Sequence, residues 1–533
     1  MKSNLLKKIS KYLKDKNVKG QTSEVRSVSS EKSNYLTSHV SRFTSFFLPL
    51  TCILICLVLI THLSSCEQDF ITPGETSTFP DSIAQLFSTP YNSTNNTCAS
   101  VSCHNSESHA GGLDLINWQK AMNGSDQGTM IIPYNGFWSH ITAVVNSDTN
   151  VSPVVEVLPT IHKMDDPNKI QMLMNWMNAG APDKNGNIAF SSISNPCFIT
   201  NQASDNIAVV NTTSRLVTRI FPVGGRQQIL DAPHYVTSDQ QNRYIFVSLI
   251  QEGYIEKYDA YTYQQVGRQA VGLNPAHLVI STDNQSGFVS NFDSGGLERC
   301  VKKFNANTLQ VLDTVSDQKM KAPHGMAAST DGQFLYVAAN IGEYIFKIDL
   351  STFEIVASVP VGPGVPPNGN GSGLYKPYQI ILSSDNSKLF VSCTADDAVR
   401  VFNTSDMTPY SPTSRIQVGD NPLLMKFSRN NQYIFVCNRN SNSVSVIDGS
   451  SYSVIKTIDS VGVQPHGVDF TVDGQYAIIA CETLAGFDGH HPTIGSNKPG
   501  VSRIIRMSDL MVESRRLEMS SFPAGIVILP FYY

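Results

Sequence analysis

From about residue 196 onward, short runs of apolar residues alternate with polar turns in a repeating order. A run such as FLYVAAN (334–340) or YIFVCN (433–438) follows a turn of Asp, Asn or Gly, and another apolar run comes after it. β-Branched and aromatic residues bounded by turn residues are typical of strands. The pattern therefore predicts an all-β domain built from antiparallel hairpins.

The repeat is clearest at a short motif, usually Pro plus one residue, that precedes the first strand of each unit. Seven copies occur, roughly 43 to 58 residues apart, at Pro233-His234, Ala276-His277, Pro323-His324, Pro377-Tyr378, Pro422-Leu423, Pro465-His466 and Pro523-Ala524. The third strand of six repeats ends on Asp or Asn, whose side chain can bond the backbone of the next turn. These residues are Asn211, Asp259, Asn305, Asp349, Asn403 and Asp448. Four antiparallel strands in about 45 residues predict the blade of a β-propeller.

The two ends of this region also fit together. Residues 198–224 read as the last three strands of a blade, and AGIVILP (524–530) can supply its first strand. Such pairing closes a ring without an exposed edge. The phrases VSVIDGSSYSVIKTI and GQFLYVAAN resemble the YVTN-type repeats of bacterial surface and periplasmic propellers. We expect residues 196–533 to form a seven-bladed β-propeller, an architecture that does not specify chemistry.

The N-terminal part predicts export. An apolar run at 46–65 is long enough to cross a bilayer, follows a basic stretch, and ends in Leu63-Ser64-Ser65-Cys66, which resembles a bacterial lipobox. We expect residues 1–66 to be a signal and lipoprotein anchor with lipid on Cys66, and residues 67–88 to be a flexible tether. An uncleaved signal anchor is the alternative. Both predictions attach the chain to the membrane on the non-cytoplasmic side of a bacterial envelope, facing the periplasm or the cell surface.

Composition removes one class of partner. The net charge is −5, and the Lys and Arg residues that cluster do so near the N-terminus. Nucleic-acid binders concentrate positive charge on a folded face. We therefore expect no nucleic-acid partner.

Between tether and propeller, Cys98 and Cys103 lie in a C-x4-C-H arrangement that ends in His104. Two thiols on a short loop can bond covalently to the haem vinyl groups while the adjacent His reaches the iron. The usual spacer has two residues, so this motif departs from the commonest pattern. A small disulfide in an oxidising compartment is the competing interpretation.

The residues around this motif carry a resemblance. GGLDL follows at 111–115, then IHKM at 161–164 and a predicted amphipathic helix, IQMLMNWMNAG, at 170–180. This order resembles the small cytochrome c domains of planctomycete and Bacteroidetes envelope proteins. The resemblance implies a small all-α cytochrome c-like domain over residues 89–190 that holds covalent haem c on Cys98 and Cys103. Its iron would be ligated by His104 and by Met164, with His162 as an alternative to Met164.

Histidines recur at the first-strand motifs of the propeller. Four of the seven motifs carry His at the same position, so that the imidazoles could converge around the central channel: His234, His277, His324 and His466. An insertion at 485–500 would place His490 and His491 above the same mouth. Imidazoles suit copper, zinc or iron, which predicts an additional transition-metal site. The competing interpretation is that these histidines bond the backbone at the channel rim, since His after Pro is frequent at this position in YVTN-like repeats. Tyr378, Leu423 and Ala524 interrupt the ring, which argues against a complete symmetric cage.

Three functions follow. The first is electron transfer outside the cytoplasm by an envelope-anchored fusion of a c-type cytochrome and a propeller, with an unidentified redox partner. The second is a propeller that binds a protein or carbohydrate and has no redox role. The third is an enzyme at the His-lined mouth, either a metal-dependent oxidoreductase or, by analogy to propeller lactonases, a hydrolase. Such lactonases favour acidic channel residues where this chain has His, so hydrolysis ranks last.

Overall fold

The computed structural model describes residues 78–91, 97–146, 148, 150–153, 162–483 and 491–530. The chain divides into two units, 1–68 and 69–533, and all described residues belong to the second. No helix within these described ranges is long and apolar enough to span a bilayer. The predicted apolar span at 46–65 and the lipidation site Cys66 lie outside the described residues, so the export prediction stays a prediction.

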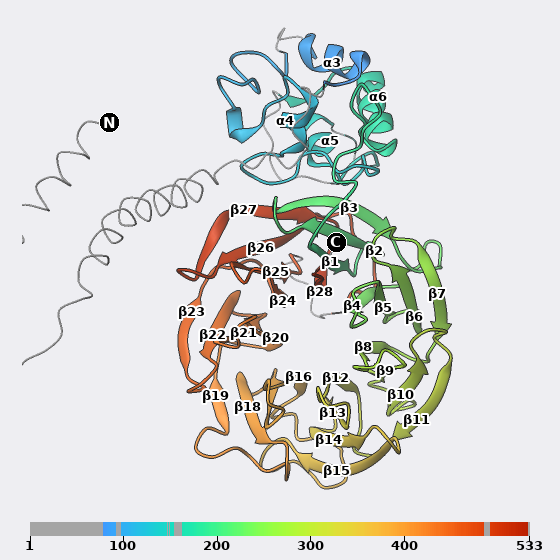
Figure 1. Cartoon of the computed structure of the whole chain (residues 1–533), viewed down its shortest axis with the longest axis vertical. Helices are drawn as coiled ribbons and strands as arrows, with labels where there is room; N and C mark the ends of the chain where they lie inside the picture. Colours follow the sequence, from blue (N-terminus) through green and yellow to red (C-terminus); the bar gives the residue numbers. More distant parts are fainter. Residues whose placement is uncertain are drawn as a thin grey trace, which may run out of the picture. The chain divides into compact units, whose positions relative to one another are not determined.

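Seven four-stranded antiparallel sheets are arranged in a ring, and in each the first strand lies innermost (Figure 1). The first blade contains β28 (Pro523–Ile528), β1 (Pro196–Asn201), β2 (Asn206–Asn211) and β3 (Leu216–Pro222). The second contains β4 (Pro233–Ser238), β5 (Tyr244–Leu249), β6 (Tyr254–Asp259) and β7 (Gln265–Ala270). The third contains β8 (Pro275–Ile280), β9 (Ser286–Asn291), β10 (Cys300–Asn305) and β11 (Val311–Ser316). The fourth contains β12 (Pro323–Ala328), β13 (Phe334–Ala339), β14 (Tyr344–Asp349) and β15 (Glu354–Pro360).

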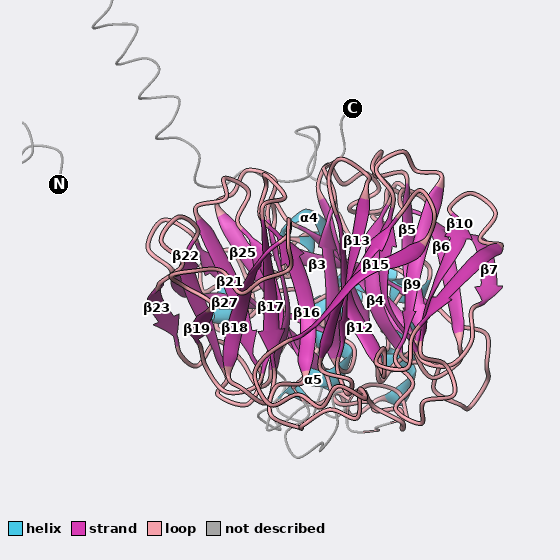
Figure 2. Cartoon of the chain, turned by 90° about the horizontal axis from the view of Figure 1, so that it is seen from below, coloured by secondary structure: helices cyan, strands magenta, loops and turns pink. Residues whose placement is uncertain are grey.

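The remaining three blades follow the same order. The fifth contains β16 (Pro377–Leu382), β17 (Lys388–Cys393), β18 (Ala398–Asn403) and the short β19 (Arg415–Gln417). The sixth contains β20 (Pro422–Phe427), β21 (Tyr433–Asn438), β22 (Ser443–Asp448) and β23 (Val454–Ile458). The seventh contains β24 (Pro465–Phe470), β25 (Tyr476–Cys481), β26 (Gly500–Arg506) and β27 (Met511–Met519). Viewed at 90°, the strands run between two faces that carry the connecting loops (Figure 2). The predicted seven-bladed propeller is confirmed.

Closure of the ring also follows the prediction. Strand β28 pairs antiparallel with β1, with Phe198 opposite Val527, so the C-terminal segment completes the first blade. The residues predicted to end the third strands do so. In the fourth blade, for example, the Asp349 carboxylate accepts hydrogen bonds from the backbone N–H groups of Ser351 and Thr352. This contact stabilises the tight turn into the fourth strand.

The strand register corrects one part of the histidine alignment. Pro275 pairs with Asn291, as Pro233 pairs with Leu249 in the preceding blade. Ala276 is therefore the counterpart of His234, and His277 lies one residue further along than the alignment predicted. Because the pairing register shifts just after the first proline of β8, an irregularity of the β-bulge type, side-chain direction there does not follow simple alternation.

A small helical segment precedes the propeller. It contains α3 (Asp81–Ser88), the 3-10 turn η1 (Ala110–Gly112), α4 (Trp118–Met122), α5 (His140–Val145) and α6 (Pro167–Asn178). Helix α3 occupies the end of the segment that the sequence assigned to the tether, and its Phe87 packs in the same hydrophobic cluster as Leu173 and Trp176 of α6. Asp166 caps α6 by accepting from the Asn168 backbone, and Pro167 begins the helix.

The helical segment contacts the outer strands of the first and seventh blades. His140 Nδ1 lies 2.5 Å from Glu518 Oε2 on β27, and the Val217 N–H on β3 donates to Thr129 Oγ1 at 2.7 Å. The guanidinium of Arg219 stacks over the Tyr134 ring at 4.9 Å. These contacts attach the segment to the propeller near the point where the ring closes.

Candidate metal centre

Three buried histidines meet at the centre of the ring, and we call them the histidine cluster: His234, His277 and His324. They begin three consecutive blades, on the inner strands β4, β8 and β12. Their ligand nitrogens all lie within 4.8 Å of one another, which means that together they could hold a metal ion. The predicted convergence of imidazoles is thus confirmed for these three, including His277 despite its shifted position.

The spacing within the cluster suits tetrahedral coordination. The Nε2 atoms of His234 and His324 are 3.2 Å apart, and one donates a hydrogen bond to the other. Two nitrogens that each lie about 2.0 Å from one tetrahedral ion are separated by about 3.3 Å. Outside the cluster, His324 Nδ1 lies 3.0 Å from the carbonyl oxygen of Tyr378, a contact that fixes the ring, as the hydrogen bonds of metal-ligating histidines do.

The backbone N–H of His277 donates to Ser290 Oγ, but one nitrogen of its ring is unsatisfied. Its ring stacks on Tyr235 at a centroid distance of 4.1 Å, and its Nε2 is buried with no hydrogen-bond partner among the described residues. Burial, with a smaller effect from the nearby His466, lowers the pKa of His277 to about 3. At neutral pH the ring is therefore uncharged and keeps a nitrogen lone pair, the state in which imidazole binds metals.

The fourth histidine belongs to a charged network beside the cluster. His466 Nδ1 lies 2.8 Å from Glu482 Oε1, and Glu482 also forms a buried ion pair with Arg439, 2.7 Å between Nη2 and Oε2. Burial by itself would raise the pKa of Glu482, but the bonds from His466 and Arg439 outweigh it and hold that pKa below its usual range. The ionised carboxylate directs His466 Nε2 toward the Tyr378 hydroxyl, which is 3.4 Å away.

Sequence reasoning missed Arg439 and Glu482. Each directly follows the second strand of its blade, β21 and β25. Aligning the residue after each second strand would have found them, because the other blades carry uncharged residues there: Gln202, Ile250, Phe292, Asn340 and Thr394. An Arg and a Glu at equivalent positions of neighbouring blades predict an inward ion pair.

The insertion predicted at 485–500 does connect the second and third strands of its blade, β25 and β26. The ring of His491 lies 4.5 Å, centroid to centroid, from that of His234 and 5.5 Å from Phe292. His491 is thus beside the histidine cluster, as predicted, whereas His490 lies outside the described residues.

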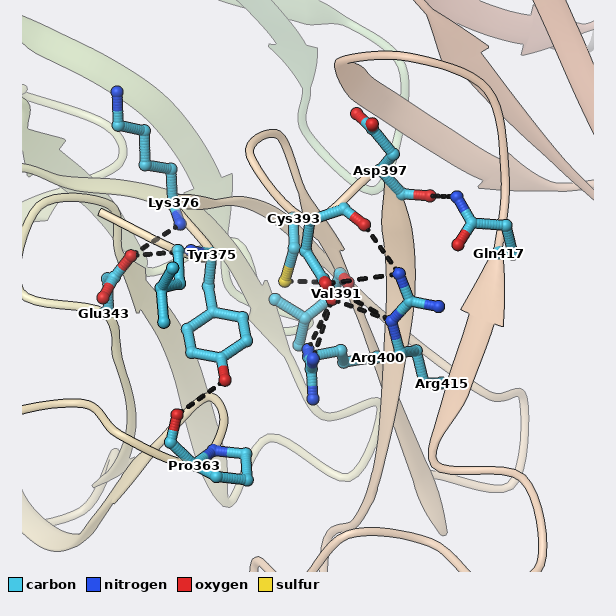
Figure 3. Close-up of polar contacts among 12 residues, drawn as sticks. Glu343, Pro363, Tyr375, Lys376, Val391, Cys393, Asp397, Arg400, Arg415 and Gln417 are labelled. Atoms are coloured by element: carbon cyan, nitrogen blue, oxygen red, sulfur yellow. Dashed lines mark hydrogen bonds and ion pairs between the residues drawn. The ribbon is translucent and has the colours of Figure 1, made fainter. Parts of the chain in front are cut away.

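A second buried polar group on the same face gives a useful contrast (Figure 3). Glu343, between β13 and β14, accepts hydrogen bonds from the backbone N–H groups of Ser372, Tyr375 and Lys376 and from the Ser372 hydroxyl. We call this group the carboxylate cluster. Burial would raise the pKa of Glu343, but these bonds lower it on balance. The cluster anchors the loop at 361–376, which connects β15 to β16.

The haem-type segment brings some of its predicted residues together. The His104 N–H donates to the Cys98 carbonyl at 3.0 Å, and the two thiols are partly buried and unbonded to each other. The rings of His104 and His162 lie 6.1 Å apart, centroid to centroid. Met164 is buried in the hydrophobic cluster of the helical segment, which also contains Trp176 and Met177.

Comparisons with known proteins concern the propeller. The family model described as "Lactonase, 7-bladed beta-propeller" matches residues 198–483. The 6-phosphogluconolactonase of Serratia proteamaculans (strain 568) is 25% identical over 143 residues, which are 25% of this chain and 43% of that enzyme. The chain thus spans less than half the length of this curated relative. The match to the family model falls within the propeller, so the cytochrome prediction stays a prediction.

One solved structure shares the fold. A functionally unknown protein from Desulfotomaculum acetoxidans DSM 771 superposes with a TM-score of 0.50 at 12% identity, covering 64% of this chain and 100% of that one. A protein from Bacteroides fragilis NCTC 9343 that has been assigned as a 6-phosphogluconolactonase gives a TM-score of 0.48 at 14% identity, covering 63% and 98%. At such identities the first likeness is a likeness of fold alone.

Proposed function

The chain belongs to the lactonase family of seven-bladed β-propellers, and on that premise we propose that its histidine cluster holds a divalent transition metal for the hydrolysis of a cyclic ester. The ranking of hydrolysis below the other functions is thereby reversed. That ranking rested on histidines standing where acidic residues were expected, and Glu482 supplies a buried carboxylate from a different position.

The observation that carries the proposal is the spacing of 3.2 Å between the Nε2 atoms of His234 and His324, with a ligand nitrogen of His277 within 4.8 Å. Three neutral imidazoles and an open fourth position form one of the known catalytic zinc arrangements, in which the metal supplies a bound water of lowered pKa. Zinc is our first expectation, since it favours nitrogen ligands in tetrahedral sites.

The neighbouring residues suit the proton transfers of lactone opening. Water adds to the ester carbonyl carbon, the ring C–O bond breaks, and the leaving oxygen takes a proton to give a hydroxy acid. His466 can accept a proton from water because the Glu482 carboxylate holds its Nδ1–H and stabilises the charged ring. Arg439 keeps Glu482 ionised, so that Glu482 acts as the orienting group and His466 as the base.

The test uses the full chain in detergent. EDTA removes bound metal, and the chain is then titrated with zinc. Hydrolysis is measured with glucono-1,5-lactone and with unsubstituted γ- and δ-lactones. We expect about one zinc per chain and a loss of roughly a hundredfold or more in hydrolysis after stripping or in His277→Leu. His109→Leu changes an exposed histidine of the helical segment and serves as the control.

Two outcomes would overturn this proposal. Bound iron or copper without lactone hydrolysis would favour a metal-dependent oxidoreductase. Zinc binding no stronger in the parent than in His277→Leu would favour a propeller that serves as a binding module.

The haem-type segment supports a second function, extracytoplasmic electron transfer by covalent haem c. The supporting observation is the tight loop at 98–104, in which backbone bonds join His104 to Cys98 and Cys103 to Ser100 while both thiols stay unbonded. A haem stain of a denaturing gel, on chain expressed with a cytochrome c maturation system, tests it. Covalent haem that is lost in Cys103→Ala supports the proposal, and no covalent haem in the parent would end it.

A further inference from the structure

The imidazole rings of two histidines of the helical segment lie at a centroid distance that suits a metal ion between them. His104 directly follows Cys103, and His162 lies five residues before the start of α6. Their ring centroids are 6.1 Å apart and their ring planes differ by 28°. Imidazoles on opposite sides of an ion, with metal–nitrogen bonds of about 2.0 Å and ring centres about 1.1 Å beyond the nitrogens, have centroids about 6 Å apart.

The nitrogen atoms of His104 are arranged as in a metal ligand. Its Nδ1 lies 2.9 Å from the carbonyl oxygen of Ala110, so Nδ1 carries the proton and donates it. A metal-ligating histidine commonly donates its second ring N–H to a carbonyl in this way, which fixes the ring and leaves Nε2 as the ligand. Burial also lowers the pKa of His104, which favours the neutral ring that ligation requires.

His162 has a nitrogen that the surrounding protein does not satisfy. Its Nδ1 is buried and has no hydrogen-bond partner among the residues that the structure describes. A buried polar atom without a partner costs free energy, and a bound ion or cofactor can offset that cost. The environment of the His162 imidazole therefore fits a ligand beside the ring better than it fits packing alone.

Met164 has a different environment. It is 6% exposed and belongs to the hydrophobic cluster that includes Leu113, Ile141 and Leu173. Its backbone N–H donates to the Val145 carbonyl at 2.9 Å, which ties this stretch to the end of α5. A thioether in such surroundings fills core volume, a common role of methionine.

We infer that His104 and His162 are the two axial ligands of a covalently attached haem, and that Met164 is a core residue. The inference rests on the proposed haem attachment at Cys98 and Cys103. A haem with two imidazole ligands has a lower reduction potential than one with His and Met ligands, because Met ligation raises the potential. The segment would accordingly carry electrons at low potential between partners outside the cytoplasm.

The experiment compares the haem-loaded full chain with His162→Ala, Met164→Leu and the control His109→Ala. The parent should lack the far-red absorption band of ferric haem with a Met ligand. His162→Ala should keep covalent haem but open the sixth position, raising carbon monoxide binding by the reduced protein about tenfold or more. Met164→Leu and His109→Ala should leave both readouts unchanged.

The possible failures are distinguishable. A far-red band in the parent that disappears in Met164→Leu, with His162→Ala unaffected, would overturn the inference and leave the haem proposal intact. Absence of covalent haem from folded parent protein would overturn both. Retention of a closed sixth position in His162→Ala would likewise overturn the assignment of His162.

Discussion

The histidine cluster and the carboxylate cluster lie on the same face of the propeller, and both bury polar side chains, the histidines at the starts of first strands and Glu343 in the loop after a second strand. They differ in how those side chains are satisfied. Glu343 receives four hydrogen bonds from the loop that it anchors, whereas His277 Nε2 has no partner among the described residues. Burial of a polar group is thus weak grounds for assigning a function. An unsatisfied ligand atom beside two other ligand atoms is stronger evidence of a binding site, because folding alone does not account for it.

The largest effect expected from this contrast is on the carboxylate cluster. Glu343→Ala should lower the free energy of unfolding by about 4 kcal/mol, because four donors that met a carboxylate lose their acceptor. Zinc affinity should stay unchanged. Chemical denaturation and zinc titration measure the two quantities, and Glu354→Ala, at an exposed position of β15, is the control. A loss of zinc binding in Glu343→Ala would remove the distinction between the clusters.

The histidine cluster should behave in the opposite way. In stripped protein, His277→Leu should change the free energy of unfolding by less than about 1 kcal/mol, because a residue of similar size replaces a ring with an unsatisfied nitrogen. Zinc at a hundred times its dissociation constant should stabilise the parent by about 2.7 kcal/mol and the variant not at all. Thermal unfolding with and without zinc measures this difference. Equal stabilisation of both proteins would show that zinc binds elsewhere.

A smaller effect should appear on acidification of stripped protein. The pKa of His277 is about 3 in the folded chain and near 6.5 when exposed. The unfolded chain therefore binds a proton that the folded chain does not, and stability falls as pH decreases between these values. Between pH 6.5 and 5.0 this histidine should lower the free energy of unfolding by about 2 kcal/mol. Denaturation curves of the parent and His277→Leu should diverge over this range, and parallel curves would contradict the assignment.

The sequence was sufficient to predict the blades but predicted only part of the candidate metal centre. Each blade repeats the same motif, so strands, ring closure and the terminal Asp or Asn of the third strands could all be predicted. His277 was misplaced by one residue because matching histidine to histidine set Ala276 against Pro233, whereas the strand pairing gives Pro275 as the counterpart of Pro233. Arg439 and Glu482 were missed because they follow the apolar strands, where nothing in the repeat drew attention to them.

The helical segment could be predicted less well, for a physical reason. It has no internal repeat, and its short helices depend on packing with one another and with β3 and β27. The amphipathic pattern identified α6, but α3 was assigned to the tether because a polar, proline-containing stretch precedes it. The choice of His162 or Met164 as the second haem ligand depends on which side chain lies near His104. The sequence does not reveal this, because the two residues are only two positions apart.

The pairing of β28 with β1 has a consequence for the order in which the molecule can assemble during translation. A nascent chain emerges with β1, β2 and β3 first, yet the innermost strand of that blade is synthesised last. Until residues 523–528 leave the ribosome, β1 keeps an unpaired edge and the ring remains open. Completion of the propeller therefore depends on synthesis of residues 523–528, and a chain that terminates before them presents an exposed edge strand to proteases and chaperones.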